Sequence, residues 1–182
     1  MMTPTQRSNA VQAVTRLILA VFRLNGRLVS AGDRLVGAVG LTSARWQVLG
    51  ALVLRDGKAT VSDAARVMGL TRQAVQRLAT AMIAEGLIET TPNPRHARAP
   101  LLKLSSKGRA AYAAAARRQA PWARELAKGV TISQLDSSQT LIATLAARLE
   151  HEAAGRNEAR PGRVPKALSV ATPTSTTRKE RA

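Results

Sequence analysis

The feature that most constrains the fold is a glycine, Gly69, between two short amphipathic segments. Ala65 lies four residues before Gly69, and Leu70 follows it directly. Two helices cross at close range only where the contact residue is small, as Ala65 is, and glycine adopts the left-handed backbone of such a turn without steric cost. We therefore predict a short helix over residues 60–68, a turn plugged by Leu70, and a second helix over residues 72–85.

Residues that favour helix ends stand at both borders of this pair. Thr60 with Asp63 resembles a capping box, and Thr71 is placed to cap the second helix. Gly86 is predicted to end the second helix. Apolar positions recur at helical spacing along the second helix and predict its buried face: Val75, Leu78 and Met82.

The opposite face of the second helix is polar and basic, and it comprises Arg72, Gln73, Gln76, Arg77 and Thr80. A helix fits the major groove of B-DNA, where arginine pairs with guanine and glutamine with adenine. We expect Gln73, Gln76 and Arg77 to reach bases. Arg72 is expected to reach a base or a phosphate, and Thr71 a phosphate beside the free N–H groups of the helix start. A merely solvated face is the alternative, which the helix-turn-helix context disfavours.

Two short strands are predicted next, over residues 87–91 and 101–104. The proline-containing loop between them carries Arg95, His96 and Arg98. Arginine on a constrained loop can enter the minor groove, where the negative potential deepens as the groove narrows. We interpret the unit as a hairpin whose Arg95 and Arg98 contact DNA, with a basic surface turn as the alternative. His96 is interpreted as a loop side chain, because no partner ligand is in sight.

Helices are also predicted on both sides of this unit. Residues 5–39 form an apolar helix with a candidate break at Asn25 and Gly26, and its apolar stripe needs a surface such as a second subunit. Thr42 caps a helix over residues 43–54. The inner face of that helix is predicted to hold Trp46, Leu49 and Val53.

The C-terminal part is predicted to hold two further helices and a tail. An alanine-rich helix runs to about Lys128 with a disturbance at Pro121, and a last helix begins at Thr131 or Ser133. After Ala153 the chain offers little to bury, so residues 153–182 are expected to be disordered. This tail holds seven basic and two acidic residues, so most of the net charge of +17 belongs to the folded part. It either adds phosphate contacts or is dispensable.

Composition narrows the partners and excludes several chemistries. The charge favours nucleic acid first and an anionic membrane surface second. There is no cysteine, the two histidines are far apart, and no phosphate-binding glycine loop is present, so neither an enzyme nor a metal or cofactor site is expected. The apolar run at residues 17–22 is too short to span a bilayer, and we expect a cytoplasmic protein without membrane contact.

Several motifs together resemble one known family. They are Leu41-Thr42, Trp46 to Leu49, Ala64-Ala65, Met68 to Thr71, Val75, Leu78, Met82, Glu85 to Ile88, and Leu104 to Gly108. Residues 41–108 thereby resemble the core of the MarR family of winged-helix regulators, and the flanking helices agree in position and length. The resemblance implies a mainly α winged helix-turn-helix with a β-hairpin wing.

The resemblance also implies an organisation and a function. Residues 1–40 and 109–152 would form a homodimer interface around the DNA-binding domain, residues 41–108. The dimer would bind a pseudo-palindromic double-stranded operator and repress, with release by a small ligand. Candidate walls for that ligand are Arg45, Trp46 and Leu49, although a packed core is the better interpretation of Trp46.

The wing departs from the family pattern at two positions. His96 stands where an acidic residue is usual two positions before the arginine, and Asn93 stands where an aspartate is common. Those carboxylates normally orient the arginine, so the support of Arg98 is left open. An architectural DNA binder with the same fold is the alternative function, and site-specific against uniform DNA binding separates the two.

Overall fold

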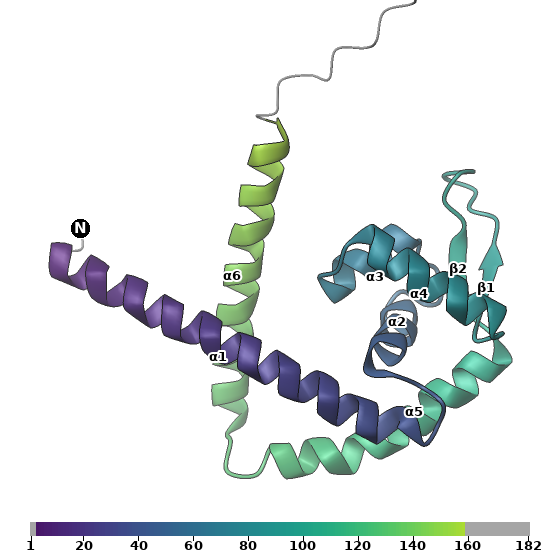
Figure 1. Ribbon diagram of the computed structural model, residues 1–182, viewed down its shortest axis with the longest axis horizontal. Helices are drawn as coiled ribbons and strands as arrows, with labels where there is room; N and C mark the ends of the chain where they lie inside the picture. Colours follow the sequence, from purple (N-terminus) through teal and green to yellow (C-terminus); the bar gives the residue numbers. More distant parts are fainter. Residues whose placement is uncertain (1–2, 159–182) are drawn as a thin grey trace, which may run out of the picture. The chain divides into compact units, whose positions relative to one another are not determined.

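The computed structural model describes residues 3–158, in two parts that are treated separately: residues 3–128 and residues 129–158. The elements are α1 (Pro4–Gly37), α2 (Ser43–Val53), α3 (Val61–Met68), α4 (Arg72–Ala84), β1 (Ile88–Thr91), β2 (Leu101–Leu104), α5 (Ser106–Leu126) and α6 (Ile132–Glu158). Figure 1 shows α2, α3 and α4 gathered beside a two-stranded hairpin, with α1 and α5 extending from this group. The predicted winged helix-turn-helix is confirmed.

Helix α1 is continuous, so the expected break at Asn25 and Gly26 is wrong. A glycine weakens a helix without ending it, and Gly26 has open space where a side chain would project. Thr3 and Gln6 form a capping box at its start. The last turns pack on the core through buried Val36, whereas the earlier turns expose a row of large apolar side chains that includes Phe22, 68% exposed.

The core lies between α2, α4, the hairpin and the start of α5. Its largest fully buried side chains are Leu49, Leu52, Met82, Ile88, Leu102, Val36, Val48 and Val75. Helix α4 buries Val75, Ala79 and Met82, while Leu78 is only half-buried. The central position of Ala79 went unpredicted, because a small residue adds little to an apolar pattern although it allows close packing.

Two predicted core residues lie at the surface. Val53 is 42% exposed, because the buried face of α2 runs through Val48, Leu49 and Leu52. Leu70 is 45% exposed and does not plug the turn. Gly69 adopts φ 63°, which ends α3 and leaves Leu70 outside the core.

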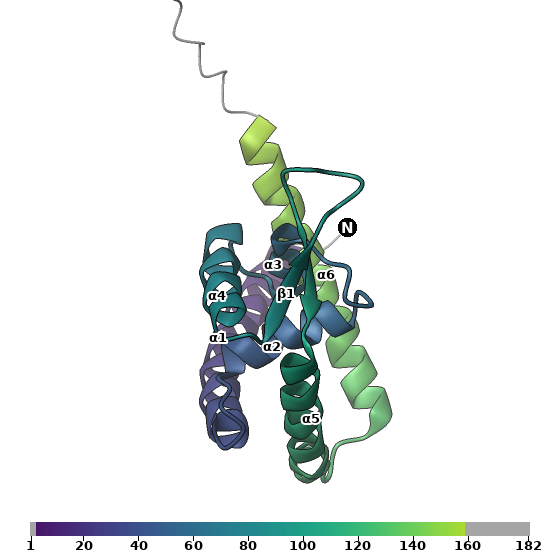
Figure 2. The ribbon, with the colours of Figure 1, turned by 90° about the vertical axis from the view of Figure 1, so that its right-hand side faces the viewer.

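The hairpin pairs β1 and β2 antiparallel, with Ile88 opposite Leu104 and Thr91 opposite Leu101. The N–H of Leu102 also donates to the carbonyl of Ala59 at 2.7 Å, which attaches the segment before α3 to the hairpin. The loop of residues 92–100 projects beyond the strands (Figure 2). This loop is called the wing below.

Helix α5 runs without interruption through Pro121, contrary to the expected disturbance. Proline removes the hydrogen bond to Arg117, but both residues are exposed, so solvent can satisfy the freed carbonyl.

Helix α6 begins after Thr131, whose hydroxyl accepts from the N–H of Gln134 at 3.2 Å. It continues to Glu158, so the predicted boundary at residue 153 falls inside this helix. The rest of the predicted tail, residues 159–182, lies outside the described residues. Over the described range, no helix has both the length and the apolar character needed to cross a membrane.

Candidate nucleic-acid interface

The turn between α3 and α4 positions the start of α4. The N–H of Leu70 donates to the carbonyl of Ala65 at 3.0 Å across Gly69. Thr71 then caps α4, because its hydroxyl accepts from the N–H of Ala74 at 3.2 Å. The cap leaves further N–H groups of the first turn directed outward, where they favour an anion.

Helix α3 is held at its own start by a capping box. The carboxylate of Asp63 accepts from the N–H of Thr60 at 3.0 Å and from its hydroxyl at 2.7 Å. These two hydrogen bonds, more than the nearby Arg66 and Arg55, lower the pKa of Asp63 below its usual 3.8. The carboxylate is therefore ionised when it caps the helix.

The polar face of α4 is fully presented to solvent. Thr71, Arg72, Gln73, Gln76 and Arg77 are all exposed, as the sequence predicted. An open hollow of about 570 Å³ lies along this face and is lined by Arg72, Gln73, Gln76 and Arg77. The structure therefore brings four of the predicted side chains together on one exposed face.

Thr80 adds a contact that the sequence did not reveal. Its hydroxyl donates to the carbonyl of Gln76 at 2.9 Å, and the amide nitrogen of Gln76 lies 3.4 Å from that hydroxyl. The side-chain amide of Gln76 is thus directed along the helix toward Thr80. The side-chain oxygen of that amide can accept a hydrogen bond from a base edge.

Asn93 organises the wing. Its side-chain nitrogen donates to the carbonyl of Ala99 at 2.8 Å, and its side-chain oxygen accepts from the N–H of Arg95 at 3.0 Å. The backbone N–H of Ala99 also donates to the carbonyl of His96 at 3.0 Å. An aspartate could accept but could not donate here, so the amide closes the loop in a way that the carboxylate could not.

The two predicted wing arginines are exposed, and one of them faces α4. A narrow space of about 90 Å³ between the wing and the helix-turn-helix is lined by Arg98 together with Arg72 and Gln76. Arg95 and His96 lie nearer the tip and are also exposed. Arg98 is therefore placed by the closed loop, on the same side as the exposed face of α4.

The C-terminal end of α4 is attached to two other helices. The guanidinium of Arg45 in α2 forms a bidentate ion pair with the carboxylate of Glu85, with N–O distances of 2.9 and 2.5 Å. The ammonium of Lys107 in α5 donates to the carbonyl of Glu85 at 2.8 Å. Sequence reasoning missed this cluster, although an acidic residue at a helix C-terminus opposes the macrodipole and signals a cationic partner.

The next residues are fixed by the start of α5. The hydroxyl of Ser105 donates to the carbonyl of Gly86 at 2.6 Å, and the N–H of Ser105 donates to the carbonyl of Leu87 at 3.1 Å. Gly108 packs against the same backbone, since a Cβ atom there would lie 2.0 Å from the oxygen of Leu87. Residues 85–87 and 105–108 are thus held together by hydrogen bonds and close packing.

The three predicted ligand-binding residues are not brought together. Leu49 is fully buried and belongs to the core, because it lies on the inner face of α2. Arg45 is engaged by Glu85. Trp46 is half-buried and, with Gly50 and Tyr112, lines a separate hollow of about 290 Å³.

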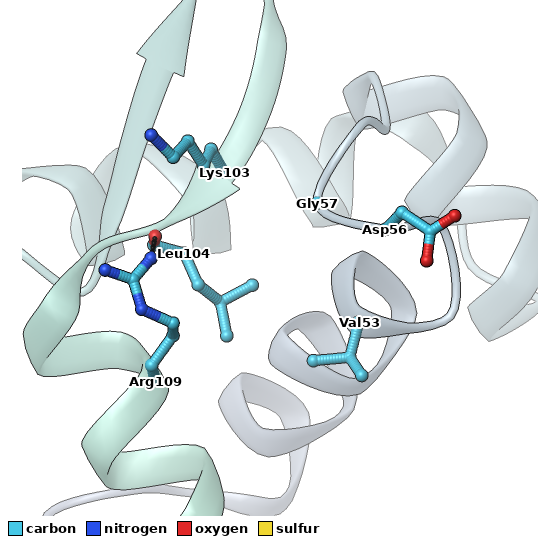
Figure 3. A pocket seen from close by; sticks show the side chains of 6 residues that line it. All are labelled: Val53, Asp56, Gly57, Lys103, Leu104 and Arg109. Carbon is cyan, nitrogen blue, oxygen red and sulfur yellow. Dashed lines mark hydrogen bonds between the residues drawn. The ribbon is translucent and has the colours of Figure 1, made fainter.

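Another hollow, of about 310 Å³, lies between α2 and the hairpin (Figure 3). Val53 and Leu104 line it, and the carboxylate of Asp56 points away from Lys103 and Arg109. Arg109 donates to the carbonyl of Leu104 at 2.8 Å and to the hydroxyl of Ser106 at 3.0 Å. The charged groups around this hollow therefore do not form an acid–base pair.

Two short helices crossing at a left-handed glycine, followed by a basic hairpin, define a winged helix-turn-helix DNA-binding protein. A sequence model of the MarR family matches residues 39–99. The uncharacterized protein Rv2011c of Mycobacterium tuberculosis is 36% identical over 139 residues, which cover 76% of this chain and 96% of that protein. The chain belongs to the MarR family of DNA-binding transcription regulators, which are not enzymes.

Three other similar proteins have a stated action or were solved with a bound molecule. The transcriptional activatory protein BadR of Rhodopseudomonas palustris is 31% identical over 102 residues, covering 54% of this chain and 58% of BadR. The M. tuberculosis regulator MosR, solved in complex with DNA, matches with a TM-score of 0.63 and 25% identity over 74% of this chain and 96% of MosR. CouR from Rhodococcus jostii, solved with p-coumaroyl-CoA, matches with a TM-score of 0.65 and 18% identity over 71% of this chain and 91% of CouR.

Proposed function

We propose that this protein is a sequence-specific regulator that reads a pseudo-palindromic operator with α4 in the major groove. The observation that carries the proposal is the exposed polar face of Arg72, Gln73, Gln76 and Arg77, whose side chains are of the types that pair with base edges. Thr71 contacts a phosphate at the start of α4. Arg95 and Arg98 on the wing reach the neighbouring minor groove.

The proposed active form is a homodimer. Large apolar side chains exposed along α1 include Val11, Ile18, Phe22 and Leu24, and so much exposed apolar surface marks an interaction site. Helix α6, taken by itself, also exposes Leu135, Ile142 and Leu149. Two copies joined by these helices would present two α4 helices to half-sites about one helical turn apart.

The proposed action is repression relieved by a small ligand. A dimer bound across a promoter blocks access to it, and a ligand that favours another arrangement of the two subunits releases it. The hollow beside Trp46 and Tyr112 supports a ligand with an aromatic or apolar part. The name of BadR states activation, so the test must allow either direction.

The decisive experiment is footprinting of the purified full-length protein on genomic DNA at physiological salt. We expect protection of a few palindromic sites far above bulk DNA. Uniform protection of every fragment would overturn this proposal and favour the architectural alternative. A promoter–reporter assay at a protected site then determines whether the protein represses or activates.

Ligand response is tested on the same operator fragment. Compounds that release the labelled DNA should also quench the fluorescence of Trp46. Because Trp122 also fluoresces, a Trp122→Phe variant isolates that signal. Release by no member of a broad set of aromatic and acyl compounds would contradict the ligand part of the proposal and leave the DNA part intact.

A further inference from the structure

The ion pair between Arg45 and Glu85 joins two helices that are far apart in sequence. The Arg66–Asp63 and Lys128–Glu125 pairs each link residues three positions apart. The Arg45–Glu85 pair instead spans 40 positions, with bidentate geometry. Its side chains are 24% and 44% exposed, so it contributes little to folding stability but fixes one relative position of α2 and α4.

The α2 end of this pair is itself attached to α1. The N–H of Ser43 donates to the carboxylate of Asp33 at 2.6 Å, and the hydroxyl of Ser43 donates to the carbonyl of Val29 at 2.8 Å. The helices are in close contact here, because a Cβ atom at Gly32 would lie 2.2 Å from that hydroxyl. The first turn of α2 therefore cannot move without α1.

Arg45 stands in this same first turn. Its N–H donates to the hydroxyl of Thr42, the cap of α2, at 3.3 Å. The first turn of α2 is therefore attached to α1 through Ser43 and to the end of α4 through Arg45.

The position of Glu85 allows its contact with Arg45 to affect the orientation of α4. Glu85 lies at the end of α4 opposite Thr71, and the face between them packs on the core through Val75, Ala79 and Met82. A shift at Glu85 therefore turns the whole exposed face relative to α1. In a dimer joined through α1, the same shift changes the distance between the two DNA-reading helices.

We infer that the Arg45–Glu85 ion pair is a positioning contact that sets the half-site spacing accepted by the dimer. The inference rests on the proposed function, in which α1 joins the subunits and α4 reads each half-site. Neither residue needs to touch DNA for this role. The pair acts by holding α4 at one orientation.

The test uses operator fragments whose half-sites are separated by different numbers of base pairs. Wild-type protein should bind one spacing best. Arg45→Met, which keeps the aliphatic stem but loses the charge, should reduce the preference for that spacing by about two- to fivefold, the upper part of the range for one partly exposed ion pair. Glu85→Gln should do the same by removing the other partner.

A charge exchange provides the rescue. Arg45→Glu together with Glu85→Arg restores the pair with unchanged net charge, and both new residues suit their helix ends. This double variant should regain the wild-type spacing profile. Arg66→Met is the matched control, because it removes one arginine and an ion pair within α3, and it should leave the profile unchanged even where it weakens binding uniformly.

The outcomes separate cleanly. A wild-type profile in both single variants, with unchanged thermal melting, would overturn the inference while the proposed function stands. Failure of the exchanged pair to restore an altered profile would also overturn it. A flat spacing profile in the wild-type protein would overturn the proposed function, and the inference with it.

Discussion

Helix α4 and the wing lie on the same side of the domain but are held in place by different forces. Three side chains of α4 are fully buried, and its two ends are fixed by Thr71 and by the contacts at Glu85. The wing buries almost nothing, and its shape depends on the side-chain hydrogen bonds of Asn93 and on two backbone turns, in which His96 donates to Asn93 and Ala99 donates to His96. The helix has a rigid geometry suited to reading bases. The wing carries positive charge on a loop that is less rigidly held.

This difference has consequences for energy. Burial of a large apolar side chain stabilises by about 1.5–3 kcal/mol, whereas an exposed hydrogen bond contributes about 0.5–1.5 kcal/mol. Changes beneath α4 should therefore affect the whole domain. Changes in the wing should affect DNA binding and leave the fold intact.

The largest effect is expected from Met82→Ala beneath α4. Met82 is fully buried, so the substitution leaves a cavity and should lower the free energy of unfolding by about 2–5 kcal/mol. Urea denaturation followed by circular dichroism measures this change. Arg95→Ala in the wing is the comparison, and its effect should stay within about 0.5 kcal/mol. Equal losses of unfolding free energy in the two variants would contradict the proposed difference between α4 and the wing.

The next effect separates base reading from charge. Gln76→Ala should cost about 1–3 kcal/mol of discrimination between the operator and single-base variants. Arg98→Ala should instead weaken binding to all sequences similarly and reduce the salt slope by about 1. Fluorescence anisotropy across several salt concentrations measures both quantities. Wild-type behaviour in both variants would show that the groove assignment is wrong.

A smaller effect is expected from Asn93→Ala. Loss of both side-chain hydrogen bonds should loosen the wing and weaken operator binding by about 0.5–1.5 kcal/mol, with unchanged melting temperature. The amide of Ala99 should exchange with solvent faster, because its bond to His96 depends on the closed loop. Unchanged exchange would mean that the two backbone turns maintain the wing without the side chain of Asn93.

The smallest effect concerns the support of α4 by α3. Because the folded pKa of Asp63 lies below 3.8, its contribution is complete above pH 3.8 and is lost as pH falls through the folded pKa. Asp63→Asn should remove this part of the acid sensitivity and cost about 0.5 kcal/mol at neutral pH. Unfolding measured between neutral and strongly acidic pH tests it, and an unchanged slope would contradict the assignment.

The sequence was most informative where signals are local. The exposed face of α4 follows from the spacing of Val75 and Met82, and its start follows from Thr71. Gly69 correctly indicated the turn. The exposed position of Leu70 depends instead on packing between segments, which no local pattern encodes. The exposure of Val53 has the same origin.

Contacts between distant segments were not predictable. Arg45 is a predicted ligand wall, but its guanidinium pairs with Glu85, which lies 40 positions further along the chain. Leu49 is predicted both as a ligand wall and on the inner face of its helix, and its full burial confirms the second prediction. In the wing, the sequence shows Asn93 only as a departure from the usual aspartate. The structure shows that its amide both donates and accepts hydrogen bonds.

The absence of a side chain at Gly108 has a mechanical consequence. The backbone of α5 rests directly on the oxygen of Leu87, leaving no room for an atom between them. Close-packed groups transmit displacement because they have no free volume in which to absorb it. A rigid-body movement of the first turn of α5 is therefore passed directly to Leu87, three residues beyond the end of α4. Helix α5 thereby couples its own length to the orientation of the proposed DNA-reading helix.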